Sequence, residues 1–167
     1  MSTNILKYAG PVISKFFSVT FNKIVSNGIF PDFCKKAKVV PILKEGDNKV
    51  PSNYRPISIV SAISKLFEKL IFKLMIKFIQ KYKLLREKEF GFREKRSTTH
   101  AILTTIDLIR SYIDKKSSVS VCFLDLKKAF DTIDHKILID KLNHYGFRDN
   151  FGLLIKSYLL NRQGTSK

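Results

Sequence analysis

Residues 119–135 read Val-Ser-Val-Cys-Phe-Leu-Asp-Leu-Lys-Lys-Ala-Phe-Asp-Thr-Ile-Asp-His, and this stretch carries the clearest indication of both fold and chemistry. Its first six residues are mostly apolar and predict a short strand over 119–124. The strand leads directly into Asp125, which would be held rigidly at a strand end and project into a cleft. Such a carboxylate suits Mg²⁺, which prefers oxygen ligands and keeps positions open for phosphate oxygens. A turn or cap residue is the commoner meaning of an aspartate at a strand end, so this stretch alone leaves both interpretations open.

Helices are predicted for most of the remaining chain. Apolar residues at three- and four-residue steps predict the clearest helix over 61–82, with a buried face of Ile63, Leu66, Phe67, Leu70, Ile71, Leu74 and Phe78. An N-terminal helix over about 11–27 is capped by Gly28. Its expected apolar face comprises Val12, Phe16, Phe17, Val19, Thr20, Ile24 and Val25. A further helix, with Ser97 or Thr98 as its N-cap, should direct inward Ile102, Leu103, Ile106 and Ile109.

The remaining elements complete an α+β pattern. Asp134 is placed to N-cap a helix through about Tyr145, and a final helix covers about 150–160. The β-branched run over 37–43 predicts a strand that Pro41 confines to a sheet edge or makes irregular, because proline lacks the amide proton of a sheet hydrogen bond. Residues 44–56 are rich in turn formers and predict a loop. Helices and strands do not alternate regularly, which favours α+β over a βαβ series.

Positive charge is concentrated in one part of the chain. The sequence has 31 Lys and Arg against 14 Asp and Glu, and residues 35–96 hold 17 of the basic and 6 of the acidic side chains. This excess indicates a polyanionic partner such as nucleic acid, although a solvated lysine-rich surface is the commoner meaning. Within the helix over 61–82, lysines recur every fourth residue, at 65, 69, 73, 77 and 81. Because like charges at this spacing repel, a phosphate backbone along the row explains it more readily than solvent.

Several other classes of protein are disfavoured. Cys34 and Cys122 lie far apart and do not form the disulfide framework of a secreted domain, and no Cys/His cluster has zinc spacing. The N-terminus lacks the apolar run of a signal peptide. The longest apolar segment, 71–79, contains two lysines and is too short to span a bilayer. These features predict an intracellular protein with no membrane partner.

Five blocks, in the same order, resemble those of reverse transcriptases from non-LTR (LINE-type) retrotransposons. The first two blocks, 30–47 and 53–58, are similar to two segments of the family's fingers. The third block, 90–93 with 97–98, is similar to the one that precedes the catalytic strand, and the fourth, 124–135, is similar to the first catalytic motif. The fifth block, 146–147 with 157–163, is similar to the segments that follow that motif. The predicted domains are therefore an N-terminal helical extension over 1–29 and a partial reverse transcriptase domain over 30–167.

The resemblance implies roles for residues near the reacting groups. Asp125 would be a catalytic aspartate that binds Mg²⁺, with the backbone carbonyl of Leu126 as a second ligand. Phe130 would pack against the sugar of the incoming nucleotide, although core packing is a serious alternative for any phenylalanine. Lys44 and Arg55 would contact the triphosphate, where a cation offsets developing charge. A solvated loop charge is the alternative for both.

The resemblance also implies contacts to nucleic acid. Phe90 and Gly91 would let the backbone approach the template closely, since glycine carries no Cβ, although a plain turn explains Gly91 nearly as well. Arg93 lies in the same block and would face nucleic acid, as would the lysines at 65, 69 and 73. Asp131 and Asp134 are assigned to turn and cap positions instead of metal binding.

The expected architecture is a partial right hand, helix-rich, with the fingers and the opening of the palm. The family's later aromatic-Ala-Asp-Asp motif, which supplies the remaining metal-binding carboxylates, does not occur in the sequence. An intact relative would use dNTPs, an RNA template and a DNA primer, whereas one aspartate cannot hold two ions, so the isolated chain is expected to be inactive. The alternatives are a non-catalytic nucleic-acid-binding remnant and, from another class, a membrane-surface protein using the helix over 61–82. An incomplete palm sheet should also leave an unpaired edge and low stability.

Overall fold

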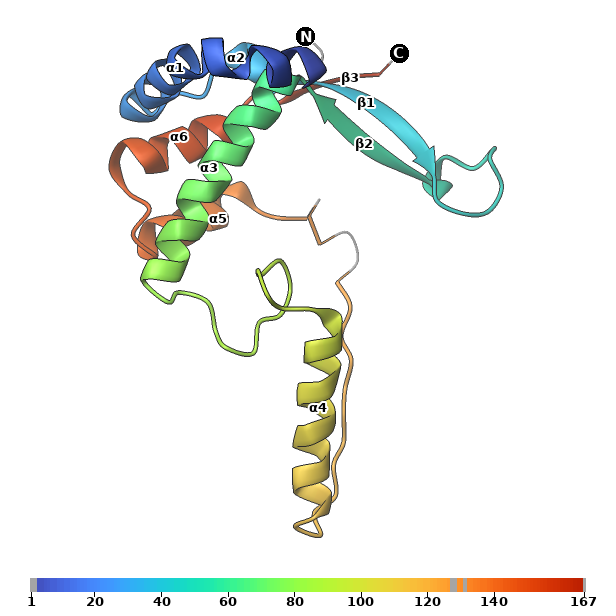
Figure 1. The fold of residues 1–167 in the computed structure, drawn as a ribbon. Coiled ribbons are helices and arrows are strands. Elements are labelled where there is room, and N and C mark those ends of the chain that lie inside the picture. The colour runs from blue at the N-terminus through green and yellow to red at the C-terminus, as the bar shows by residue number, and fades with distance from the viewer. Residues whose placement is uncertain (1–2, 127–128, 131, 167) are drawn as a thin grey trace. The chain divides into compact units, whose positions relative to one another are not determined.

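The computed structural model describes residues 3–126, 129–130 and 132–166, and the chain divides into two compact units. The first unit comprises Met1–Met75 with Asp134–Lys167, and the second comprises Ile76–Ile133. The helices are α1 (Thr3–Asn27), α2 (Asp32–Lys35), α3 (Ala62–Lys81), α4 (Thr98–Ile113), α5 (His135–His144) and α6 (Asp149–Leu159) (Figure 1). Helix α3 begins in the first unit and ends in the second, and α4 belongs to the second.

The core of the first unit forms where α1, α3 and α6 contribute apolar side chains to one cluster. Its buried members are Phe21, Ile24, Phe30, Cys34, Phe67, Ile71, Leu154 and Ile155. Phe67 stacks on Phe21 with ring centroids 6.0 Å apart, and Phe30 meets Tyr158 edge-on at 5.0 Å. Full burial of each phenylalanine side chain stabilises the fold by about 1.5–3 kcal/mol. The core therefore joins segments from both ends of the chain.

Helix α1 differs from its sequence-based expectation in length and in its buried face. It begins at Thr3 instead of near residue 11 and continues through Pro11. Phe21 is buried although it was not expected to be, whereas the predicted inward residues Val12, Phe16 and Val19 are exposed. The apolar stripe of α1 is wider than the surface that covers it. The spacing of apolar residues in the sequence does not show which part of the stripe is covered.

The end of α1 is as predicted. Gly28 has φ +65°, a left-handed conformation that favours glycine. A Cβ at this position would lie 2.9 Å from the backbone oxygen of Asn150 and from the Cβ of Leu153. Gly28 therefore both ends α1 and permits the close approach of α6.

A three-stranded sheet of order β2-β1-β3 completes the first unit. The central strand β1 (Lys36–Leu43) is antiparallel to β2 (Tyr54–Val60) and parallel to β3 (Gln163–Ser166). The expectation that this strand lies at a sheet edge was wrong, and the strands β2 and β3 were not predicted. Pro41 nevertheless lies where β1 has a neighbouring strand on one side only. Strand β3 pairs only with Lys36–Val39, and Pro41 pairs with Pro56 of β2 on the other side.

The loop predicted over 44–56 is shorter than expected. Its last three residues belong to β2, and Pro51–Asn53 form a short 3-10 turn. Within the loop, Asp47 Oδ1 accepts a hydrogen bond from the backbone N–H of Lys49 at 2.9 Å, and Tyr54 Oη donates to the carbonyl of Asn48 at 2.8 Å. These bonds order the turn that joins β1 to β2.

The second unit contradicts two predictions. Residues 117–126 have no regular secondary structure, so the strand predicted over 119–124 was wrong. A strand needs a neighbour to receive its backbone hydrogen bonds, and no described residue pairs with this segment. Helix α4 has no buried residue, so Ile102, Leu103 and Ile106 are exposed and not directed inward as expected.

The predicted bounds of three helices and two predicted N-caps are confirmed. Helices α3, α5 and α6 lie within one or two residues of their predicted bounds. Ser97 caps α4 by accepting a hydrogen bond from the backbone N–H of His100. Asp134 caps α5, since its Oδ1 accepts from the backbone N–H groups of Lys136 at 2.7 Å and Ile137 at 3.1 Å.

Candidate nucleotide and nucleic-acid site

Asp125, the predicted catalytic aspartate, lies in the second unit within the irregular segment 117–126. It is exposed, and no hydrogen bond or ion pair joins its carboxylate to another described residue. It does not cap a helix. Leu126, whose carbonyl was predicted as a second ligand, has its side chain 77% exposed. The Asp125 carboxylate is therefore accessible to a ligand from solvent.

The described residues supply only part of a magnesium site. None of them forms a group of three or more His, Cys, Asp or Glu side chains that could hold a metal ion. Asp134 is occupied as the cap of α5, and Asp131 lies outside the described residues. Two magnesium ions beside phosphate charge require several carboxylates, so Asp125 and its neighbours do not fit a complete two-ion site.

The two predicted triphosphate contacts lie in the first unit, on the hairpin formed by β1 and β2. Arg55 pairs with Ile42, and the ladder extends by one step because the backbone N–H of Lys44 donates to the carbonyl of Asn53 at 2.8 Å. Lys44 directly follows β1 and Arg55 is the second residue of β2, so both lie at the turn end of the hairpin. Both are exposed, although Lys44 Nζ also forms an ion pair with Glu45 at 3.2 Å.

Phe130 lies in the second unit beside an aromatic residue that the sequence analysis did not single out. Its side chain is 75% exposed, and its ring centroid is 6.1 Å from that of Phe92 in an edge-to-face arrangement. Core packing therefore does not account for Phe130 in this structure. Phe92 is also exposed. Its position in the block Phe90-Gly-Phe92 is the sequence feature that could have indicated it as a candidate site residue.

The loop that contains Phe90, Gly91 and Arg93 is ordered by its own side chains. The guanidinium of Arg93 donates to the carbonyls of Arg86 at 2.7 Å and Glu89 at 3.2 Å. Arg93 therefore stabilises this loop, which leaves fewer of its donors for a ligand. Arg96, not considered from the sequence, lies 5.3 Å from the ring centroid of Phe90. Apart from its chain neighbours, no described residue has an atom within 4 Å of a Cβ built on Gly91, so the surrounding space is open.

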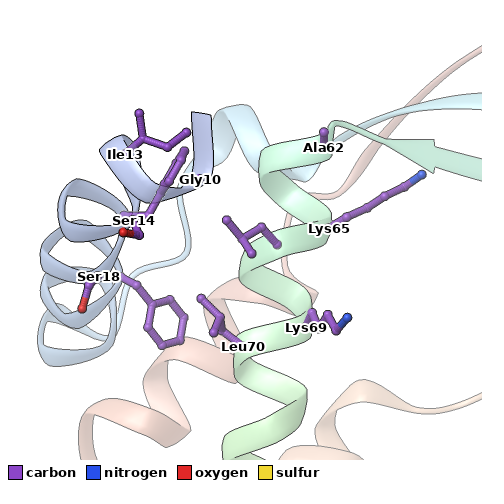
Figure 2. A pocket seen from close by; sticks show the side chains of 11 residues that line it. Gly10, Ile13, Ser14, Ser18, Ala62, Lys65, Lys69 and Leu70 are labelled. Carbon is purple, nitrogen blue, oxygen red and sulfur yellow. The ribbon is translucent and has the colours of Figure 1, made fainter. Parts of the chain in front are cut away.

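The lysines predicted to contact nucleic acid form an exposed row on α3. Lys65, Lys69 and Lys73 are exposed, and the side chains of Lys65 and Lys69 extend from α3 on the side away from α1 (Figure 2). Glu68 does not neutralise the row, because its carboxylate accepts hydrogen bonds from Tyr158 and Arg162, each at 3.1 Å. The positive charge of these lysines is therefore uncompensated by the acidic residue nearest to them in sequence.

A groove of about 760 Å³ lies between α1 and α3, on the opposite side from the lysine ends (Figure 2). Apolar side chains, including Phe17, Phe21, Leu66 and Leu70, form most of its lining. Lys65 and Lys69 also contribute to the lining, although their side chains extend away from α1 (Figure 2). Among the described residues, no helix has the length and apolar character needed to cross a membrane.

Comparison with known proteins identifies relatives across most of the chain. The family described as reverse transcriptase (RNA-dependent DNA polymerase) matches residues 42–167. The chain is 34% identical over 149 residues to the probable RNA-directed DNA polymerase from transposon X-element of Drosophila melanogaster, and 32% identical over 149 residues to that from transposon BS of the same organism. It is 28% identical over 151 residues to the RNA-directed DNA polymerase from the D. melanogaster mobile element jockey. Each alignment covers 89% of this chain but only 16% of the relative.

Proposed function

Because the chain belongs to the reverse transcriptase (RNA-dependent DNA polymerase) family, we propose that it forms the fingers and the opening of the palm of a retroelement polymerase with a right-hand fold. In the whole protein these parts would help to extend a DNA primer along an RNA template. The observation that carries the proposal is the position of Asp125 within the family match: it is exposed, forms no hydrogen bond or ion pair with another described residue, and directly follows an apolar run.

The hairpin supports a role in binding the triphosphate of an incoming nucleotide. Lys44 and Arg55 both lie at the turn end of the hairpin, and a hydrogen bond from Lys49 to Asp47 orders the turn between the strands. Arg55 offers a planar fork of donors suited to two phosphate oxygens, whereas Lys44 offers a point charge. The pair would hold the phosphates and offset negative charge that develops during nucleotidyl transfer.

The exposed row on α3 supports a second role, the binding of a nucleic-acid backbone. Lys65, Lys69 and Lys73 repel one another at four-residue spacing. A phosphate backbone along the row would remove this repulsion and release condensed counterions. Phe130 and Phe92 would offer exposed aromatic surface to the sugar or base of a bound nucleotide.

Asp125 would contribute one carboxylate to the magnesium site of the whole polymerase, with the Leu126 carbonyl beside it. When bound, magnesium ions stabilise charge on the attacking and leaving oxygens. The described residues do not complete that site, and the sequence lacks the aromatic-Ala-Asp-Asp motif. The isolated chain is therefore expected to bind nucleic acid without extending a primer.

Paramagnetic Mn²⁺ tests the role of Asp125 in the isolated chain. Substoichiometric Mn²⁺ should broaden the amide resonances of Asp125 and Leu126 in the wild type but not in Asp125→Asn, which keeps the shape and loses the charge. Asp114→Asn, which changes an exposed aspartate outside the motif, serves as the matched control and should leave the broadening unchanged. Equal broadening in wild type and Asp125→Asn would exclude Asp125 as a metal ligand.

Primer extension separates the catalytic from the non-catalytic alternative. On an RNA template with a DNA primer, the purified chain should give no product with Mg²⁺ and dNTPs. Product formation that Asp125→Ala abolishes would show that the chain is active without the missing motif. A nucleic-acid-binding remnant and an incomplete polymerase segment both predict no product, but only the second predicts Mn²⁺ broadening at Asp125.

Binding to an RNA–DNA hybrid tests the α3 row. Changing Lys65, Lys69 and Lys73 together to Ala should reduce the slope of log K against log salt by about 2–3. Liposomes of anionic lipid, compared at the same salt, test the membrane-surface alternative. Stronger binding to liposomes than to the hybrid would favour that alternative and count against the polymerase proposal.

A further inference from the structure

A polar pocket of about 450 Å³ lies beside the start of β1, and none of the residues predicted from the sequence to bind metal, nucleotide or nucleic acid lines it. It is lined by the α2–β1 junction and the turn between α6 and β3: Asp32, Lys35, Lys36, Asn161, Arg162 and Gln163. All six residues are polar or charged, in contrast to the groove between α1 and α3. Three cations and one carboxylate in the lining favour an anionic ligand. The volume falls within the roughly 300–1,000 Å³ typical of ligand sites.

Two of the three cations are held in place before any ligand binds. The side chain of Lys35 is only 8% exposed, and its ammonium forms an ion pair with Asp32 at 2.8 Å. The guanidinium of Arg162 forms an ion pair with Glu68 at 3.1 Å and lies 4.4 Å from the ring centroid of Tyr158. Fixed side chains lose little conformational entropy when a ligand arrives, which favours binding.

Lys36 differs from these two residues because it is exposed and forms no ion pair with another described residue. Its position follows from the sheet, where the parallel pairing of β1 and β3 sets Lys36 beside Gln163. Asn161 has φ +56°, a left-handed conformation that asparagine adopts more readily than most residues. This turn brings Arg162 and Gln163 to the wall of the pocket.

We propose that this pocket binds a phosphate group and, resting on the proposed function, that the phosphate belongs to a nucleic-acid backbone. The Arg162 guanidinium keeps donors that the Glu68 ion pair does not use, since a guanidinium carries five N–H groups. Lys36 supplies a second charge, and the side-chain amides of Asn161 and Gln163 can supply neutral donors. Asp32 opposes the ligand, but its carboxylate is already paired with Lys35.

Inorganic phosphate is the first probe. It is titrated into the ¹⁵N-labelled full chain against chloride at equal ionic strength, and amide resonances of residues 161–163 are followed. We expect saturable shifts in the wild type and a dissociation constant at least about fivefold higher in Lys36→Ala, which removes one charge-assisted contact. Lys15→Ala removes an equal charge from the exposed surface of α1 and should match the wild type. No saturable shift, or equal affinity in Lys36→Ala and Lys15→Ala, overturns the inference.

Substitution of the opposing carboxylate provides a test of opposite sign. Asp32→Asn removes the one acidic side chain of the described lining and should tighten phosphate binding, because less negative charge faces the ligand. Asp149→Asn, an equal charge change elsewhere in the first unit, should have a smaller effect. Unchanged or weaker phosphate binding in Asp32→Asn counts against an anion site in this pocket.

Binding of a labelled single-stranded RNA separates this inference from the proposed function. If Lys36→Ala weakens phosphate binding but binds RNA like Lys15→Ala, the pocket takes free phosphate and the nucleic-acid source is rejected. The change of Lys65, Lys69 and Lys73 to Ala could leave RNA binding intact while Lys36→Ala weakens it. That result rejects the nucleic-acid role of the α3 row and supports the pocket as the binding site. If only the α3 variant weakens RNA binding, the nucleic-acid source of the phosphate is rejected for the pocket and the proposed function stands.

Discussion

Cys34 and Ser64 meet in the core of the first unit, where a polar side chain and a thiol are both excluded from water. Each has a relative exposure of 0%, and Ser64 Oγ donates to the carbonyl of Cys34 at 2.8 Å. A buried hydroxyl is tolerated only when it is hydrogen-bonded. The bond links α3 to α2 at the point where β1 begins, so it holds the hairpin and the Lys35–Lys36 segment in place.

Ser64→Ala should lower the free energy of unfolding by about 1–3 kcal/mol, because the buried carbonyl of Cys34 loses its partner. Urea denaturation of the two proteins at neutral pH measures the difference. Ser18→Ala, at an exposed position of α1, is the control and should change stability by less than about 0.5 kcal/mol. A Ser64→Ala protein as stable as this control would show that the bond contributes nothing.

The thiol of Cys34 predicts a loss of stability at alkaline pH. Burial, with a further contribution from the negative charge of Glu68, raises the pKa of Cys34 from 9.0 to about 11. The folded chain therefore keeps this proton while the unfolded chain releases it. The contribution of the protonated Cys34 thiol to the free energy of unfolding is fully present below pH 9 and is lost as the pH rises toward 11.

Urea denaturation across pH 8 to 11 tests this linkage. The wild type should lose stability more steeply with pH than Cys34→Ala, which has no thiol to titrate. Comparing slopes cancels the contribution of other groups in this range, including Tyr158, whose pKa burial also raises. Parallel slopes would show that the Cys34 proton is not linked to folding. Exposed Cys122 should react readily with a thiol reagent at pH 8, whereas Cys34 should not.

Among the elements, α5 shows how one aspartate has a structural role inside the segment that resembles the family's first catalytic motif. Asp134 accepts two backbone hydrogen bonds at the start of the helix and follows Asp125 by nine residues. An N-cap aspartate also interacts favourably with the helix dipole. The carboxylate of Asp134, the third in this segment after Asp125 and Asp131, is therefore already occupied by backbone hydrogen bonds.

Asp134→Ala should lower the free energy of unfolding by about 0.5–2 kcal/mol, because two amides at the start of α5 lose their acceptor. Asp134→Asn keeps an acceptor oxygen and should retain most of the stability. Asp140→Ala, in the interior of the same helix and exposed, controls for loss of charge. Thermal or urea unfolding distinguishes the three, and equal stability of Asp134→Ala and Asp140→Ala would contradict the cap.

The elements predicted from sequence are those that local spacing determines. Periodicity and capping residues located α3, α5 and α6 because a helix makes its hydrogen bonds within itself. Strands depend on distant partners, which explains the errors over 54–60, 119–124 and 163–166. Pro56 is a turn former, so the start of β2 was predicted as loop. The short strand β3 forms through its pairing with β1.

For the candidate site, the family resemblance indicated Asp125, Lys44 and Arg55 but not the residues that lie beside the predicted site residues. The edge-to-face contact of Phe92 with Phe130 joins residues far apart in sequence. The hydrogen bonds of Arg93 to backbone carbonyls depend on a loop conformation that no spacing rule specifies. Likewise, the hydrogen bond from Arg162 to Glu68 requires the turn after α6 to lie beside α3.

At the scale of the whole molecule, the two units differ in how much apolar surface they bury. The first unit has a continuous core, whereas α4 buries none of its residues and Phe123 and Leu124 are 88% and 90% exposed. Exposed apolar surface of this extent marks an interaction site or an aggregation liability. We therefore expect the isolated chain to have low stability, with the second unit opening more easily than the first.

Native-state amide hydrogen exchange measures this difference directly. Amides of residues 119–126 should exchange at nearly unprotected rates, because no described residue receives their hydrogen bonds and few apolar contacts cover them. Amides near Phe67 in α3 and Leu154 in α6 should exchange only through global unfolding, since both side chains are fully buried. The β1–β2 ladder should lie between these limits. Protection over 119–126 equal to that around Phe67 would mean that this segment is covered in solution, by self-association or by a strand pairing absent from this structure, and measurement at several protein concentrations would separate the two.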